Sequence, residues 1–267
     1  MAEDKSNRDK GKGPSKRGKA NWNRGNRVDK PKEFDKEAWK PKTSLGMKVK
    51  TGEIDNIDHI LDNRLKILER EIVDILMPDL TTDLLLVGQS KGKFGGGQRR
   101  VFRQTQKKTQ EGNKPKFGTF AIVGNGDGYV GIGYGKSKET VPAREKATRN
   151  AKLNIIKIIR GNGSWQDVSS EPNSIPFAIE GKCGSSKIRL IPAPRGTGLC
   201  IEGECGKVLK IAGIKDIWSE TFGQTGTKTN LIWACFDALK KLSDVKIQKE
   251  TAEKLGVVEG KGVSQDE

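Results

Sequence analysis

Cysteine and histidine are scarce in this chain of 267 residues, which has four cysteines and one histidine. Four cysteines are too few for the disulfide framework of a secreted domain. The single histidine, His59, stands in an acidic segment, so no Ser/His/Asp or Cys/His catalytic arrangement can be drawn. The N-terminus lacks an apolar signal core, and no run approaches the roughly 18–20 apolar residues of a membrane span. We therefore expect a non-enzymatic protein of the reducing cytoplasm.

The cysteines also lack the spacing of a zinc site. Cys200 and Cys205 are separated by four residues, and neither Cys183 nor Cys235 supplies a convincing further ligand pair. We expect ordinary buried or half-buried thiols, with no metal and no cofactor.

Charge is abundant and unevenly spread. The net charge is +16 and the sequence pI is near 9.6, which favours a polyanionic partner. Residues 1–50 hold 16 Lys and Arg against 7 Asp and Glu, residues 51–87 hold 3 against 9, and residues 88–118 hold 9 against 1. The basic segments predict contact surfaces for nucleic acid. The acidic segment is expected to pack on its own domain or to dock a basic protein.

The hydrophobic pattern predicts an α+β protein with two domains. Residues 1–44 form a basic extension with almost no aliphatic side chains, expected to be disordered alone. Its aromatic rings, Trp22, Phe34 and Trp39, are either solvated or stacked on RNA bases. Apolar residues with helical spacing, including Leu65 and Leu68, follow between 52 and 78.

Residues 117–123 and 128–134 alternate as strands around a turn at 124–127. A helix follows, with Thr140 as the expected N-cap and a stripe of alanines at 143, 147 and 151 that permits close packing on a sheet. The first domain is therefore expected over 45–160.

The second half is expected to hold a linker at 161–175 and an α+β domain at 176–243. The pattern predicts strands at 177–181, 187–192 and 214–219, and helices at 207–212 and 230–242. From Asp244 to residue 267 the chain is polar and is expected to fray.

Two glycine motifs suggest nucleotide binding but fail on context. Gly126, Gly128 and Gly131 match the dinucleotide fingerprint, yet the residues after Gly131 alternate as a strand where a helix should open. Gly135-Lys136-Ser137 ends like a phosphate loop but starts one residue short. We interpret these glycines as a tight hairpin with close backbone approach.

The strongest functional signal is a glycine-rich basic stretch over 91–103, interpreted as a hairpin lying against RNA. Glycine permits close approach to phosphates, and arginine pairs with them through two parallel hydrogen bonds. Basic side chains of the helix after residue 140 and of the second domain extend the surface. The predicted RNA-binding residues are Lys91, Lys93, Arg99, Arg100, Arg103, Lys107, Lys108, Lys136, Arg144, Lys146, Arg149, Arg195 and Lys228.

Three stretches resemble the small-subunit ribosomal protein family numbered five, in its archaeal and eukaryotic branch. They are FGTFAIVGNGDGYVGIGYGKS at 117–137, CGS at 183–185 with IRLIPAPRGTGL at 188–199, and VLKIAGIKDI at 208–217. The resemblance covers roughly residues 45–243 and points to the archaeal side.

The resemblance implies an N-terminal double-stranded-RNA-binding-like domain (α-β-β-β-α) and a C-terminal α+β domain. It also implies a place in the small ribosomal subunit, bound to small-subunit ribosomal RNA near the head–body junction and the messenger entry. There the fourth and eighth small-subunit proteins are expected as neighbours, and assembly, decoding accuracy and translation as roles. The alternative is a non-ribosomal regulator that binds double-stranded RNA.

Overall fold

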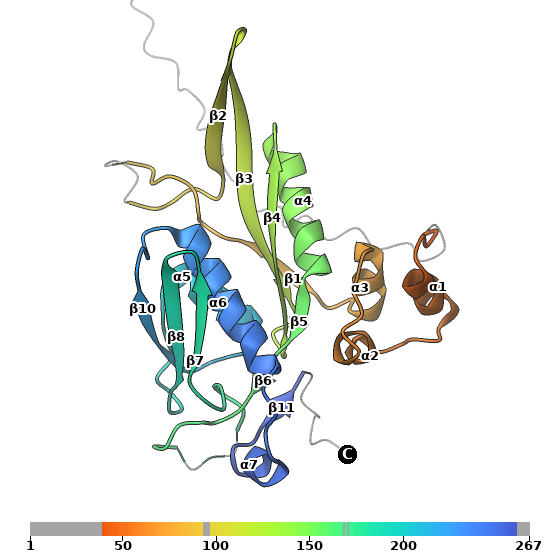
Figure 1. Cartoon of the computed structure of the whole chain (residues 1–267), viewed down its shortest axis with the longest axis vertical. Helices are drawn as coiled ribbons and strands as arrows, with labels where there is room; N and C mark the ends of the chain where they lie inside the picture. Colours follow the sequence, from red (N-terminus) through yellow and green to blue (C-terminus); the bar gives the residue numbers. More distant parts are fainter. Residues whose placement is uncertain (1–38, 93–96, 168, 170, 261–267) are drawn as a thin grey trace, which may run out of the picture. The chain divides into compact units, whose positions relative to one another are not determined.

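Three short helices lead into the first sheet. The computed structural model describes residues 39–92, 97–167, 169 and 171–260, and the helices are α1 (Ser44–Thr51), α2 (Ile57–Asp62) and α3 (Arg70–Leu76) (Figure 1). The predicted helical character of 52–78 is thus confirmed only in two pieces. Arg64 adopts a left-handed φ of 53° between them, and Leu65 and Leu68 are 42% and 61% exposed instead of lying on an apolar stripe.

Trp39 belongs to the folded part of the chain. Its side chain is only 9% exposed, and its carbonyl oxygen accepts a hydrogen bond from Nζ of Lys50 at 2.6 Å. Both alternatives, a solvated ring and a ring stacked on RNA bases, are therefore wrong for Trp39. Trp22 and Phe34, in the basic extension, lie outside the described residues.

The first sheet has five strands in the order β1-β3-β4-β5, with β2 also paired to β3. The strands are β1 (Thr81–Leu84), β2 (Arg103–Thr109), β3 (Gly112–Gly124), β4 (Tyr129–Ser137) and β5 (Ile155–Lys157). β1 pairs with the end of β3 and β2 with its beginning, so both lie on the same edge. The predicted hairpin around 124–127 is confirmed as β3 and β4.

Helix α4 (Thr140–Leu153) covers one face of this sheet at close range. A Cβ atom at Gly133 would lie 2.1 Å from the backbone nitrogen of Ala151 and 2.2 Å from the carbonyl oxygen of Ala147. The expected alanine stripe is confirmed, because all three alanines are buried against glycines of β4. Thr140 is the first helical residue rather than the N-cap, a position that Glu139 occupies without a side-chain hydrogen bond.

The second half forms a four-stranded sheet, in the order β7-β8-β10-β9, with two helices. Its elements are β7 (Ile179–Cys183), β8 (Ser186–Pro192), β9 (Leu199–Cys200), α5 (Gly203–Ile211), β10 (Ile217–Phe222) and α6 (Lys228–Ser243). Each predicted element appears in its type and order. Helix α5 begins earlier than predicted because the Glu202 side chain caps it, accepting the N–H groups of Glu204 and Cys205.

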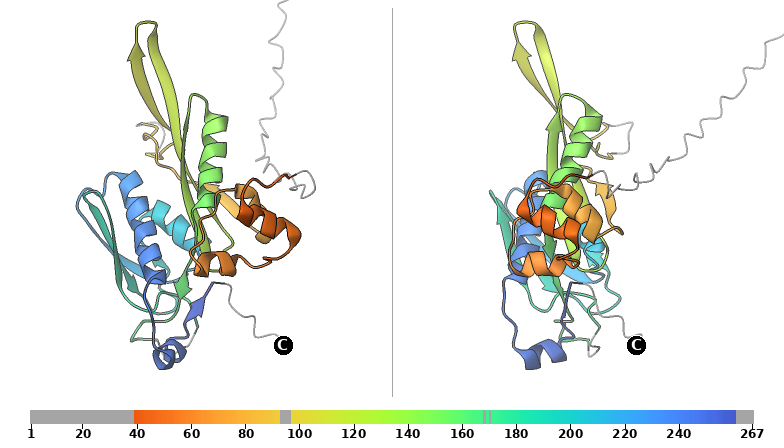
Figure 2. Two further views of the ribbon diagram at one scale, coloured as in Figure 1. Left: turned by 45° about the vertical axis from the view of Figure 1, so that its right-hand side comes forward. Right: turned by 90° about the vertical axis from the view of Figure 1, so that its right-hand side faces the viewer.

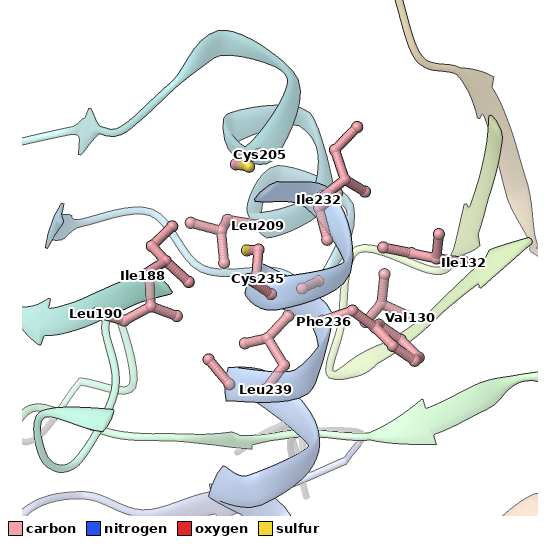
Figure 3. Packing of buried hydrophobic residues seen from close by; sticks show 14 of the residues in the cluster. Val130, Ile132, Ile188, Leu190, Cys205, Leu209, Ile232, Cys235, Phe236 and Leu239 are labelled. Carbon is pink, nitrogen blue, oxygen red and sulfur yellow. The ribbon is translucent and has the colours of Figure 1, made fainter. Parts of the chain in front are cut away.

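One hydrophobic core joins the two halves. Helix α6 lies between the sheets, and its Ile232 and Phe236 approach Val130 and Ile132 of β4 (Figure 3). On its other side Leu239 approaches the buried side chains of β8. The two expected domains therefore share buried surface, which fixes the first sheet against α6.

The expected linker and C-terminal extension are both structured in part. Ser174 forms a bridge with Gly161, and β6 (Ile159–Arg160) pairs with β11 (Val258–Glu259). The buried guanidinium of Arg160 donates to Asp127 at 2.7 Å and to the carbonyl of Gly260 at 3.0 Å. With α7 (Lys249–Lys254) also present, the fraying expected from Asp244 onward is wrong for residues 249–260.

The acidic segment of 51–87 packs on its own domain. Asp58 accepts a hydrogen bond from the Tyr129 hydroxyl at 2.7 Å, and Asp62 pairs with Lys157 at 2.9 Å. Asp74 pairs with Lys152 of α4. Although burial lowers the pKa of Lys157, its hydrogen bond to Asp62 and the nearby charge of Asp58 hold that pKa above the ordinary value. These contacts anchor α2 and α3 to the first sheet.

Candidate nucleic-acid interface

Strands β2 and β3 continue beyond the sheet as a two-stranded ribbon. β4 pairs with β3 only from Phe117 onward, so residues 112–116 of β3 pair with β2 alone. The views of Figures 1 and 2 show this ribbon extending past the end of β4. Apart from the half-buried Thr109, the residues of 103–116 are exposed on both faces. An isolated two-stranded ribbon is marginally stable in water, so this one suits a partner that covers it.

The register places five cations on one face. Cross-strand partners point to the same side of a sheet, and alternate residues of a strand share a side. Lys107 is directly opposite Lys114, and Arg103 and Lys136 both flank Gly118 on neighbouring strands. The five residues, called the cation face below, are Arg103, Lys107, Lys114, Lys116 and Lys136.

The cation face has little internal compensation. Glu111 at the ribbon's turn pairs with Lys114 at 2.8 Å, and both side chains are largely exposed. Among the described residues, the other four cations form no ion pair. Directly opposed like charges such as Lys107 and Lys114 are destabilising in a strand pair. The arrangement is therefore suited to a polyanion that neutralises it.

A second, shorter basic hairpin precedes the ribbon. Ser90 forms a bridge with Arg99, and Nζ of Lys91 donates to the side chain of Gln98 at 2.8 Å. Arg99 is half-buried and Arg100 is exposed. The single hairpin predicted over 91–103 is thus corrected to two, since its last residue already belongs to β2. Lys93 lies outside the described residues.

The predicted basic residues of α4 lie on the other side of the first sheet. Arg144, Lys146 and Arg149 are exposed on the helix that covers the glycine-lined face. By strand alternation, Lys108 also points to that side. The sheet therefore separates the predicted residues of its strands and of α4 into two groups, with Arg103, Lys107 and Lys136 on one side and Lys108 and the α4 cations on the other.

Two predicted residues of the second domain have partners within the protein. Lys228 pairs with Glu202, and Arg195 donates to Glu171 at 3.0 Å. Burial raises the pKa of Glu202, but the hydrogen bond and charge of Lys228 outweigh it and hold the pKa below its ordinary value. Neither cation is joined to the cation face by an observed contact.

Sequence reasoning missed Lys114 and Lys116 as members of the site. Both stand in the stretch with 9 basic and 1 acidic residue, but without the strand register they could not be assigned to a face. The only available signal was the spacing of Lys114 and Lys116 two residues apart, which puts them on one face if the segment is a strand.

The features that suggested other chemistry have structural explanations. Gly126 and Gly128 adopt positive φ angles in the turn between β3 and β4, and Gly131 continues as strand, as expected.

Cys205 and Cys235 are buried together, and their hydrogen bond, with burial, raises the pKa of the Cys205 thiol. Cys200 is exposed, contrary to expectation.

The described part of the chain holds neither a cluster of metal ligands nor a membrane-spanning helix. Within it, no three His, Cys, Asp or Glu side chains gather in a way that could hold a metal ion. Its helices are all too short or too polar to cross a bilayer.

Comparison with known proteins gives matches over both halves of the chain. The family model described as "Ribosomal protein S5, N-terminal domain" matches residues 101–159, and the C-terminal domain model of the same family matches 181–254. The Small ribosomal subunit protein uS5 of Nanoarchaeum equitans is 49% identical over 224 residues, which are 84% of this chain and 96% of the relative. The protein of the same name from Methanocaldococcus jannaschii is 46% identical over 229 residues, 85% of this chain and 98% of the relative.

Proposed function

The chain belongs to the ribosomal protein S5 family of archaeal type, and on that premise we propose that it is a structural constituent of the small ribosomal subunit that binds small-subunit ribosomal RNA. The observation that carries the RNA contact is the cation face. Three of its cations lie on the exposed ribbon and two flank Gly118, and among the described residues only Lys114 of the five has an ion-pair partner.

The ribbon binds RNA through phosphates rather than through base sequence. Its lysines act as compact point charges, and Arg103 can hold a phosphate with two parallel hydrogen bonds. Each phosphate neutralised in this way releases condensed counterions, so binding depends steeply on salt. The pairing of β2 with β3 spaces the charges, and the shared core orients them.

The cations of α4 form a second RNA contact on the opposite side of the sheet. Arg144, Lys146 and Arg149 project from the helix surface that faces away from the glycines of β4. With the cation face on one side of the sheet and these cations on the other, the domain can stand between two RNA segments. Such double-sided contact suits a protein whose role is to hold RNA helices in a fixed arrangement.

The finer placement follows the family resemblance. We propose that the protein lies near the head–body junction and the messenger entry, beside the fourth and eighth small-subunit proteins, with messenger RNA passing nearby. In that position it supports assembly, decoding accuracy and translation in the cytoplasm, and it acts by holding RNA rather than by catalysis. The matches to both domain models of the family, over 101–159 and 181–254, support this proposal.

Sedimentation of tagged protein through a sucrose gradient, followed by a high-salt wash, tests the assignment. A structural constituent stays with the small subunit at about one copy per particle. A non-ribosomal regulator of double-stranded RNA remains near the top of the gradient or washes off, and that result would overturn the proposal.

A further inference from the structure

A cavity of about 220 Å³ opens beside the cation face, between the first sheet and the beginning of α6. Three aromatic side chains form its walls. The ring centroids of Phe120 and Tyr134 are 4.9 Å apart, and those of Phe120 and Trp233 are 5.9 Å apart at 68°. Tyr134 is 39% exposed, whereas Phe120 is buried, so the tyrosine ring lies at the opening. The cavity is smaller than the roughly 300–1,000 Å³ of drug-sized sites and suits one flat ring system.

Polar side chains complete the lining. Arg103, Thr229 and Asn230 line the cavity together with the rings. Within the described residues, none of these three side chains, nor the Tyr134 hydroxyl or the Trp233 indole N–H, forms a hydrogen bond to the protein. The site therefore presents aromatic faces and several available donors and acceptors at one place.

The position of Arg103 connects the cavity to the cation face. Arg103 lines the cavity and also lies in the row with Gly118 and Lys136. A phosphate held by Arg103 would bring its own nucleotide to the opening. A carbohydrate or an apolar peptide side chain would gain nothing from the adjacent positive charge, whereas a nucleotide joins an anion to an aromatic ring.

We propose that this cavity binds a single unstacked nucleobase of the RNA strand that lies on the cation face. The base stacks on Tyr134 and Trp233, and the Asn230 amide hydrogen-bonds its edge. Unpaired bases in loops and bulges are the RNA elements that proteins recognise by stacking and edge contacts. The inference rests on the proposed RNA binding and adds a preference for RNA that offers an unpaired base at this point.

The test uses the full chain and two RNA stems of about 16 base pairs, the span covered by double-stranded-RNA-binding modules. One stem carries a bulged 2-aminopurine and the other an abasic nucleotide at the same bulge, so both have equal numbers of phosphates. We expect the protein to bind the stem with the base about 5- to 150-fold more tightly, given the usual contribution of one stacked base. Stacking should also quench the 2-aminopurine emission.

The matched variants are Tyr134→Leu and Tyr134→Phe, with folding checked by circular dichroism. The leucine variant should lose the preference and the quenching while its salt dependence stays that of the parent. The phenylalanine variant should keep both, because the ring remains. Salt-dependent binding of both stems with equal affinity would overturn the cavity proposal alone, whereas no binding of either stem would refute the proposed RNA binding itself. If Tyr134→Leu is incorporated less well into subunits while the parent protein shows no preference for the stem with the base, the proposal is also overturned. The cavity would then be assigned to a protein side chain.

Discussion

The opposed lysines of the ribbon offer the sharpest test of the cation face. Lys107 and Lys114 are directly opposite each other on β2 and β3, and both are exposed. Replacing both with Gln removes two of the five cations while keeping long polar side chains on the strands. The variant K107Q/K114Q should bind RNA more weakly, with a shallower salt dependence.

The size of the change follows from the number of phosphates neutralised. Each contact contributes about 0.7 to 0.9 to the slope of log K against log salt, so losing two contacts should reduce the slope by about 1.4 to 1.8. For the cation face alone, a fourfold rise in salt weakens binding about 100- to 500-fold with five contacts and about 20- to 40-fold with three. Filter binding to small-subunit ribosomal RNA over a salt series measures both quantities.

The free energy of unfolding of K107Q/K114Q should stay close to that of the parent, or rise slightly, even though RNA binding weakens. Removing two opposed like charges relieves a repulsion of about 0.2–1 kcal/mol. The same variant loses the exposed ion pair of Lys114 with Glu111, which contributes about 0–1 kcal/mol. The free energy of unfolding should therefore change by about 1 kcal/mol or less in either direction, so weaker RNA binding cannot be attributed to unfolding.

The chain contains a matched control. Lys182 and Lys187 are also directly opposite each other, on β7 and β8, and both are exposed. Carboxylates accompany them on the same sheet face, where Arg189 lies near Glu180 and Glu220. The variant K182Q/K187Q has the same net charge as K107Q/K114Q, and its slope should equal that of the parent. An unchanged slope for K107Q/K114Q, or equal losses in both variants, would refute the role of the cation face.

Three further changes test the fold that supports this face. Glu202→Gln should destabilise the protein by about 1–2 kcal/mol at neutral pH, since it weakens the cap of α5 and the pair with Lys228. Because the folded pKa of Glu202 is held below its ordinary value of 4.5, its contribution to the free energy of unfolding is present above that pH and lost on acidification. The free energies of unfolding of the parent and of Glu202→Gln should therefore converge below about pH 4.5. Gly133→Ala should cost about 1–3 kcal/mol in chemical denaturation, because the added Cβ meets the α4 backbone at 2.1 Å; an equally stable variant would contradict this packing. Lys157→Met should cost about 1 kcal/mol and speed amide exchange in α2 and β11, whose carboxylates it holds, and unchanged exchange there would show that other contacts anchor them.

Much of the first sheet could be predicted because its strands bury one or both faces. Residues 117–123 and 128–134 carry the alternation that a half-buried hairpin requires, and the alanine spacing of α4 matches a helix lying close on glycines. Strand β2 has no such pattern. Both of its faces are exposed, so no apolar alternation marks it, and the basic hairpin was expected earlier in the chain.

The C-terminal segment escaped prediction for a different reason. Helix α7 has no buried residue, and β11 is held by backbone pairing to β6 together with Lys157 and Arg160. Backbone pairing leaves no signature in side-chain composition. A polar sequence therefore looks free to fray even where its hydrogen bonds are satisfied by a distant strand.

The division of the basic residues between two surfaces was also beyond sequence reasoning. A charge count assigns Lys107 and Lys108 to one cluster, but successive side chains of a strand point to opposite faces of the sheet, so the two lysines lie on different faces. The register of a strand pair, set by its turn, decides which cations act together.

Strand β3 links the core to the candidate interface. On one face of this strand, Ile122 and Phe120 are buried in the shared core, and Lys116 and Lys114 continue the same face into the exposed ribbon. Gly118 lies between the buried and the exposed part of this face, with Arg103 and Lys136 beside it on the neighbouring strands. Because one strand carries both sets of side chains, packing against α6 determines where the cation face points. A core substitution at Ile122 should therefore disturb RNA binding through orientation as well as through stability, although it lies in the buried part of the strand.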